Sequence, residues 1–221
     1  MKACGRILIA LLLVGVNPVY AYYYAGISAD AIYSFESDKT QGDAQGLSAD
    51  VMLGYGVDRF FTSLKLGVGG EVFSGSSDAS QDVNGFEIIS GYRVTPMLSA
   101  YVGYRFRNFD FMRRGANQLA ATEQFNHYGI GGSINYPLDK QWLLRADVFA
   151  YYLTNYYESD TLSNSGSGYS GGTSLGTLYR WRDGVNFSLS YRLQFTRADY
   201  FTGGALDSID TGLSIGVTKI F

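Results

Sequence analysis

The last twelve residues of the chain, DTGLSIGVTKIF (210–221), show the pattern from which the fold is predicted. The side chains alternate between two kinds. One set is mainly large and apolar: Ile209, Thr211, Leu213, Ile215, Val217, Lys219 and Phe221. The other is mainly small or polar: Asp210, Gly212, Ser214, Gly216, Thr218 and Ile220. A repeat of two residues predicts a β-strand with one apolar and one polar face. A soluble β-sandwich has similar strands, so the rest of the chain must separate the two architectures.

The same alternation recurs along nearly the whole chain after residue 22. A membrane-crossing strand needs about 9–11 residues, and each predicted segment is longer than that. The pattern predicts ten strands, at 23–36, 45–57, 59–73, 83–95, 97–110, 124–136, 141–155, 169–182, 185–198 and 208–221.

The connections between these segments alternate between two lengths. VDRF, TPM, PLDKQ and RDG are short, whereas SDKTQGDA, SGSSDASQD, MRRGANQLAATE, YESDTLSNSGSG and YFTGGAL are longer and polar. Short turns at one end and long loops at the other are typical of an outer-membrane barrel, with the long loops outside the cell. Within the fourth long connection, SNSGSG (163–168) is predicted to be a mobile loop tip.

Charged residues gather on one face of the predicted strands. The opposite face carries almost no charge except Lys219, near the chain end. An Arg or Lys facing lipid at mid-bilayer costs roughly 2–4 kcal/mol, so a one-residue slip in register would be strongly unfavourable. The charged face is predicted to enclose a lumen charge network of Asp30, Glu36, Asp50, Lys65, Glu71, Glu87, Arg93, Arg105, Arg107, Arg145, Asp147, Arg180, Arg192 and Asp210.

Small and aromatic residues separate a membrane barrel from a sandwich. Glycine and serine share the charged face, which suits a crowded barrel interior better than an exposed sheet. Aromatic residues on the apolar face form two predicted girdles. One, near the short turns, is Tyr23, Tyr55, Phe60, Tyr92, Tyr136, Trp142, Trp181, Phe187 and Phe221; the other is Tyr33, Tyr128, Tyr152 and Tyr169. We therefore predict an all-β fold, an antiparallel up-and-down transmembrane β-barrel of ten strands, with eight as the alternative count.

The first residues have the three parts of a secretory signal peptide. Lys2 and Arg6 precede the apolar run 7–16, and Val19-Tyr20-Ala21 resembles a cleavage site. The apolar run is short for a spanning helix, which needs roughly 20 residues, although an uncleaved anchor stays an alternative. We predict a signal peptide at 1–21, export, and one barrel domain at 22–221. Since Cys4 is the only cysteine, the mature chain has no disulfide, and its mild acidity argues against a nucleic-acid partner.

The alternating strands and the terminal GLSIGVTKIF resemble the small outer-membrane β-barrel proteins of Gram-negative bacteria, broadly the OmpA/OmpX/OmpW-like group. The resemblance implies an integral protein of the cell outer membrane, in contact with outer-membrane lipids and lipopolysaccharide. It also implies that Gly212 and Phe221 belong to a C-terminal signal read by the barrel-assembly machinery. Most members of that group have eight strands, and ten is the count in the omptin proteases.

The sequence contains little that indicates an enzyme. His127, the single histidine, is predicted to face the lumen near the outer end of the sixth strand, and NHYGIGG contains no His-x-Ser arrangement. Omptin-like proteases need Asp–Asp and Asp–His pairs at the outer rim. One histidine, no mature cysteine and scattered carboxylates predict no metal or cofactor. A barrel hydrolase using His127 stays an alternative hypothesis.

The remaining features predict a non-enzymatic outer-membrane protein. Its lumen charges either satisfy one another in a structural network or line a narrow polar passage for small solutes. The alternative is a cell-surface binding or adhesion protein that acts through its long loops. There, Arg113-Arg114 would meet lipopolysaccharide phosphates, and YYLTNYYESD would continue a strand above the membrane. The sequence names no surface partner.

Overall fold

The computed structural model describes residues 21–36, 43–73, 79–113, 119–159, 162–200 and 205–221. None of these residues forms a helix long and apolar enough to cross a membrane. They form ten strands: β1 (Ala21–Glu36), β2 (Ala44–Val57), β3 (Phe60–Phe73), β4 (Ala79–Arg93), β5 (Leu98–Arg113), β6 (Leu119–Pro137), β7 (Trp142–Ser159), β8 (Ser163–Arg180), β9 (Val185–Tyr200) and β10 (Ala205–Ile220). Nearly all of the predicted signal peptide lies outside the described residues.

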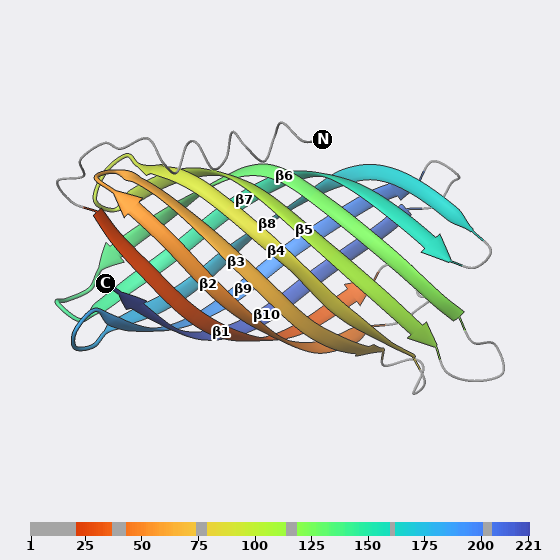
Figure 1. Cartoon of the computed structure of the whole chain (residues 1–221), viewed down its shortest axis with the longest axis horizontal. Coiled ribbons are helices and arrows are strands. Elements are labelled where there is room, and N and C mark those ends of the chain that lie inside the picture. Colours follow the sequence, from red (N-terminus) through yellow and green to blue (C-terminus); the bar gives the residue numbers. More distant parts are fainter. Residues whose placement is uncertain (1–20, 37–42, 74–78, 114–118, 160–161, 201–204) are drawn as a thin grey trace.

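The strands close into one barrel, in which each strand pairs antiparallel with its neighbours in sequence and β1 pairs with β10 (Figure 1). At the seam, Tyr24 lies opposite Ile220, and the Phe221 backbone N–H donates to the Tyr23 carbonyl at 2.8 Å. Phe221 thus continues the closing ladder with its ring facing outward. Closure leaves no strand edge unpaired, as a spanning sheet requires. The ten-strand prediction is confirmed, and the alternative of eight is wrong.

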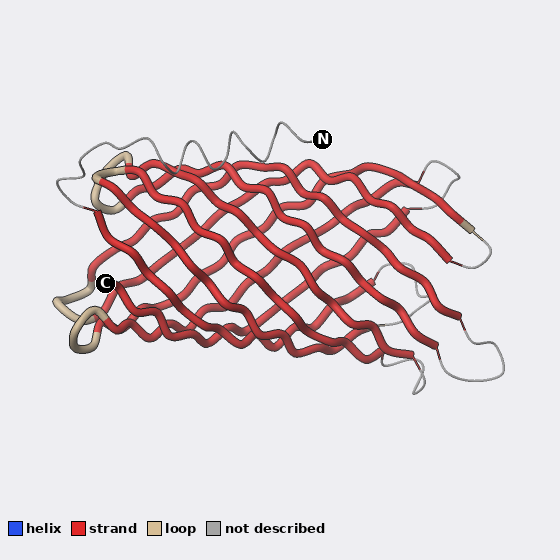
Figure 2. The backbone as a smooth tube through the Cα atoms, in the orientation of Figure 1, coloured by secondary structure: helices blue, strands red, loops and turns tan. Residues whose placement is uncertain are grey.

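The strand ends agree with the predictions at the short-turn end, whereas most strands run further toward the long loops (Figure 2). The largest difference is at 163–168, predicted to be a mobile tip but belonging to β8. There Ser163 lies opposite Glu158 of β7, and Gly166 opposite Tyr200 of β9. A Cβ on Gly166 or Gly168 would lie 1.9 Å from a β9 carbonyl oxygen. These glycines therefore permit close backbone approach, and the loop prediction mistook that requirement for flexibility.

Two tight turns use residues with positive φ. Asp58, between β2 and β3, has φ 51°, and the β8–β9 turn has Asp183 at 53° and Gly184 at 75°. A Cβ on Gly184 would lie 2.7 Å from the Ile220 carbonyl oxygen, so this turn both needs a left-handed conformation and leaves no room for a side chain. The turn therefore packs against Ile220 at the end of β10.

The outward face of the barrel is apolar. Leu47, Ile27 and Ile130 are 72%, 64% and 66% exposed, and Phe221 of the predicted girdle is 71% exposed. An exposed apolar surface continuous around a barrel is stable in hydrocarbon and would be unfavourable in water. Every strand of the closed barrel contributes exposed apolar residues to this surface, and Figure 2 shows the tilt of the strands.

The outward face carries more charge than the sequence predicts. Asp82 lies opposite Asp110, on the same face as the opposed pair Phe86 and Phe106. Asp110 accepts hydrogen bonds at 3.0 Å from Asn108 and Thr122. Arg197 lies 3.6 Å from Asp199 on the same strand. These groups all lie toward the long-loop ends of their strands. The prediction of an uncharged outer face was therefore too broad, because the strands extend beyond the apolar belt.

Candidate functional site

The barrel encloses a cavity of about 590 Å³ in its lumen. Of the predicted lumen charges, two do not line it. Arg93 and Arg180 are exposed at the short-turn ends of their strands, and the Glu36 side chain lies outside the described residues. Glu123, which was not among the predicted charges, also lines the cavity. The predicted charges that line it are Asp30, Asp50, Lys65, Glu71, Glu87, Arg105, Arg107, Arg145, Asp147, Arg192 and Asp210.

Lys65 on β3 lies near two carboxylates, one on the neighbouring strand and one on the strand beyond it. Its Nζ lies 2.6 Å from Asp50 Oδ2 on β2 and 3.9 Å from Asp30 Oδ2 on β1. Ser28 donates to Asp50 and Ser48 to Asp30, each at 3.4 Å. Opposite charges on adjacent strands thereby satisfy one another across the wall of the barrel.

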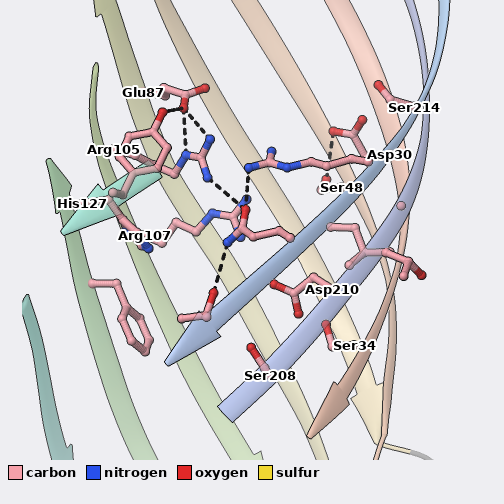
Figure 3. Close-up of a pocket in the computed structure, with 18 of the residues that line it drawn as sticks. Asp30, Ser34, Ser48, Glu87, Arg105, Arg107, His127, Ser208, Asp210 and Ser214 are labelled. Atoms are coloured by element: carbon pink, nitrogen blue, oxygen red, sulfur yellow. Dashed lines mark hydrogen bonds and ion pairs between the residues drawn. The ribbon is translucent and has the colours of Figure 1, made fainter. Parts of the chain in front are cut away.

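Arg105 is the most deeply buried cation of the lumen, with its residue 6% exposed. Its Nε donates to Glu87 Oε1 at 2.8 Å, and its Nη1 donates to Gln194 Oε1 at 3.3 Å (Figure 3). Tyr151 OH also donates to Glu87, at 3.2 Å, and the guanidinium lies 5.1 Å from the Tyr151 ring centroid. The pair needs these contacts, because a buried charge without a partner is strongly destabilising.

A third ion pair lies near the short turns. Arg145 Nε and Nη2 each donate to Asp147 at 2.9 Å, and Ser174 donates to Asp147 at 3.1 Å. The Arg145 side chain is 51% exposed, so water reaches this end of the lumen. Solvent screening makes this pair weaker than the buried one.

Four lumen charges have no ion pair within 4.0 Å among the described residues: Arg107, Arg192, Glu71 and Asp210. Arg192 donates to the neutral Gln194 Oε1 at 2.5 Å and lies 4.8 Å from the Phe149 ring centroid. Glu71 accepts from Gln81 at 2.5 Å. Figure 3 shows Arg107 beside Arg105, and Asp210 without a dashed line. We call these four the uncompensated groups.

Aromatic rings of the inner wall lie over glycines of the neighbouring strands. A Cβ on Gly54 would be 1.9 Å from Tyr24 Cζ, and one on Gly131 would be 2.3 Å from Tyr101 Cζ. The rings therefore occupy the space that side chains would fill, and they lie along the wall instead of extending across the lumen. Tyr22 follows the same arrangement over Gly56, where its hydroxyl accepts from Arg93.

The outer part of the lumen contains two apolar clusters that the sequence analysis missed. Phe73 packs with Ala44 and Phe111, and Phe125 packs with Leu153, which is fully buried. The sequence contains a signal for these clusters, because their residues lie on the same face of each strand as the charged residues. The prediction of a polar inner face therefore extends too far toward the outer ends of the strands.

His127 faces the lumen as predicted, but its position along the barrel was wrong. It lies in the middle of β6 because that strand starts at Leu119, earlier than expected. The residue is 3% exposed, its Nδ1 has no hydrogen-bond partner, and its ring lies 5.9 Å from the ring of Tyr151. The outer rim, where the catalytic pairs of omptin-like proteases are expected, is thus not where this histidine lies. Among the described residues, no group of three or more His, Cys, Asp or Glu is placed to hold a metal ion.

The sequence matches no protein-family model, and no curated protein matches it. Solved structures match the fold. The outer membrane protease OmpT from Escherichia coli is 9% identical, with 94% of this chain and 99% of that chain covered and a TM-score of 0.59. The β domain of the Bordetella autotransporter BrkA is 12% identical, with 90% and 99% covered and a TM-score of 0.57.

The translocator domain of the autotransporter NalP from Neisseria meningitidis is 13% identical, with 97% of this chain and 93% of that chain covered and a TM-score of 0.50. At these identities the similarity shows the fold alone. The chain has the architecture of an outer-membrane β-barrel, a fold that carries a protease in one case and autotransporter domains in others.

Proposed function

We propose that this chain is a non-enzymatic integral protein of the outer membrane whose lumen passes small polar solutes. The cavity supports this most strongly, because it combines a volume of about 590 Å³ with four charged groups that have no ion pair within 4.0 Å among the described residues. A purely structural interior would be expected to satisfy its charges internally. The rings of Tyr24 and Tyr101 support it further, because they lie over Gly54 and Gly131 of the neighbouring strands.

The membrane location and partners belong to the same proposal. The exposed apolar belt fits the hydrocarbon of the bilayer, and the charged long-loop ends fit the lipopolysaccharide headgroups. The exposed Phe221 ring at the closing seam fits recognition by the barrel-assembly machinery. Export by a cleaved signal peptide at 1–21 stays a prediction.

Conductance across a planar lipid bilayer tests the passage of solutes. Refolded barrel should produce discrete current steps that are smaller than those of a wide porin channel, because side chains narrow the lumen. The control is the same preparation after heat unfolding, which should produce none. The absence of steps from barrel with a full β-sheet circular dichroism signal would contradict the proposal.

A surface-binding role is the second candidate, and one observation favours it. β6, β7 and β8 are the longest strands, with 19, 18 and 18 residues, so the sheet extends furthest on this side. Tyr156 is 40% exposed on the outward face of this extension, where exposed aromatic side chains suit partner recognition.

Shortening the β7–β8 hairpin tests this second role. Tyr156 lies opposite Ser165, so replacing 156–165 by Asn-Gly keeps the register of the remaining pairs. If the extension binds cells or matrix, the shortened barrel should lose adhesion yet keep its conductance. Unchanged adhesion would exclude this hairpin as the binding surface.

A further inference from the structure

We propose that the uncompensated groups of the lumen form a binding site for a small zwitterion, a molecule with one carboxylate and one ammonium group. Its carboxylate would lie against Arg107 and Arg192, and its ammonium against Asp210 and Glu71. The inference rests on the proposed function only in treating this molecule as the solute that passes.

The carboxylate end is indicated by guanidinium groups that converge on a neutral acceptor. Arg105 Nη1 and Arg192 Nη2 both donate to Gln194 Oε1, at 3.3 and 2.5 Å. The charges of Arg105 and Arg107 both act on Arg192 through space. Glu87, the carboxylate in contact with Arg105, is already bound by Arg105 and Tyr151. A ligand carboxylate would supply the missing anion and form charge-assisted hydrogen bonds.

His127 provides a second, independent observation at the same place. It lines the cavity directly across the strand pair from Arg105, and it is 97% buried. Its Nδ1 has no hydrogen-bond partner among the described residues. Buried polar atoms normally have a partner, so this atom indicates a site that a ligand completes.

The ammonium end is indicated by carboxylates on the other side of the cavity. The charges that act on Arg107 include those of Asp210 and Glu71, yet neither lies within ion-pair distance of it. Among the described residues, the only hydrogen-bond donor in contact with either carboxylate is the Gln81 amide. An ammonium group placed between Asp210 and Glu71 would therefore meet two acceptors.

A zwitterion fits this lining better than a simple ion. Seven carboxylates and five cationic side chains line the cavity, so a free anion would meet an excess of negative charge beyond the arginines. A free cation would meet the arginine cluster, and an uncharged polyol would leave both sets unpaired. The cavity volume lies within the range of small-molecule sites, which is about 300–1,000 Å³.

Calorimetric titration of the barrel in detergent micelles with L-alanine tests the binding. Wild type should bind L-alanine. R107Q, R192Q and D210N should each bind about tenfold more weakly, since one charge-assisted hydrogen bond is worth about that factor. R180Q is the matched control and should bind as wild type, because Arg180 lies outside the cavity. Arg107 donates no side-chain hydrogen bond within the described barrel, so R107Q should fold even if R192Q does not. No binding, or equal affinity for wild type and R107Q, would overturn the inference.

Liposome swelling separates this inference from the proposed passage. Faster uptake of L-alanine than of glycerol, with the advantage lost in R107Q, would support both. Binding of L-alanine without swelling would support the site and remove the passage. Equal uptake of both solutes without measurable binding would support the passage and overturn the site.

Discussion

The lumen has two regions that differ in whether their charged side chains form ion pairs. In the first, Arg105 lies directly opposite Glu87, and Lys65 lies beside Asp50 on the next strand. In the second, the register places a glycine across from each of three charges. Gly85 lies opposite Arg107, Gly212 opposite Arg192, and Gly46 opposite Glu71. The difference teaches that the residue directly opposite does not alone decide pairing, because Asp50 also lies opposite a glycine, Gly67, and is still paired with Lys65.

The order of the strands bears on why the uncompensated groups do not form ion pairs with one another. Arg107 and Asp210 lie on β5 and β10, which share no strand boundary. The closed sheet fixes the positions of these two strands, and no ion pair within 4.0 Å joins the two side chains among the described residues. A rigid closed sheet can therefore keep unpaired charges that a flexible interior would bring together.

The largest effect is expected from Glu87→Gln. This change leaves Arg105 buried without a carboxylate, so the free energy of unfolding should fall by about 3–5 kcal/mol. Urea unfolding in lipid vesicles measures it. Asp210→Asn is the matched control, and it should cost less than about 1 kcal/mol because Asp210 has no ion pair to lose. Equal losses for the two variants would break the distinction between the regions.

A smaller effect is expected at the ring recesses near the short turns. Gly54→Ala places a Cβ 1.9 Å from Tyr24 Cζ and should force the ring toward the axis. We expect a loss of about 1–3 kcal/mol from overpacking, together with reduced bilayer conductance. Adding Tyr24→Ala should restore the conductance. A Gly54→Ala barrel with unchanged conductance would show that the ring does not border the path.

The exposed ion pair should contribute less. Asp147→Asn removes the partner of Arg145, whose side chain is 51% exposed, so unfolding free energy should fall by about 0–1 kcal/mol. Urea unfolding at low and high salt measures this, and the difference should shrink with salt. A loss as large as that of Glu87→Gln would mean that the short-turn end excludes water.

Much of the fold follows from the sequence, because alternation, turn length and the charge-free belt are repeated in every strand. The wrongly predicted strand ends share one physical cause. Beyond the membrane the outer face of a strand meets water, so the alternation that marks Val51 or Leu66 disappears, and β8 from Ser163 looks like a loop.

The site was less predictable for a different reason. The odd or even numbering of Arg107 and Arg192 predicted that they face the lumen, but ion pairing depends on which other lumen side chains lie within reach, and those neighbours emerge only from the closed sheet. The apolar clusters around Phe73 and Phe125 show the same limit, because parity gives the face but not the contacts.

The smallest effect is expected in the β6–β7 turn. Asp139 Oδ1 accepts from the backbone N–H groups of Gln141 and Trp142, at 2.6 and 2.7 Å, which holds the pKa of this carboxyl below its ordinary value. Its stabilisation is therefore present above the unfolded pKa of about 3.9 and is lost as pH falls through the folded value. Asp139→Asn should be slightly less stable than wild type at pH 7 and equal to it at acid pH. A difference that grows toward low pH would contradict this sign.

The central claim, that the uncompensated region is open to polar solutes, is tested most directly by cysteine accessibility. A chain of residues 22–221 has no cysteine, so single reporters are unambiguous. Ser208 lines the cavity, whereas Ser170 is 2% exposed inside the barrel. With a charged methanethiosulfonate added to refolded barrel, Ser208→Cys should be modified quickly and Ser170→Cys should stay unmodified. If Ser208→Cys proved as unreactive as Ser170→Cys, the lumen would be closed and the account would fail.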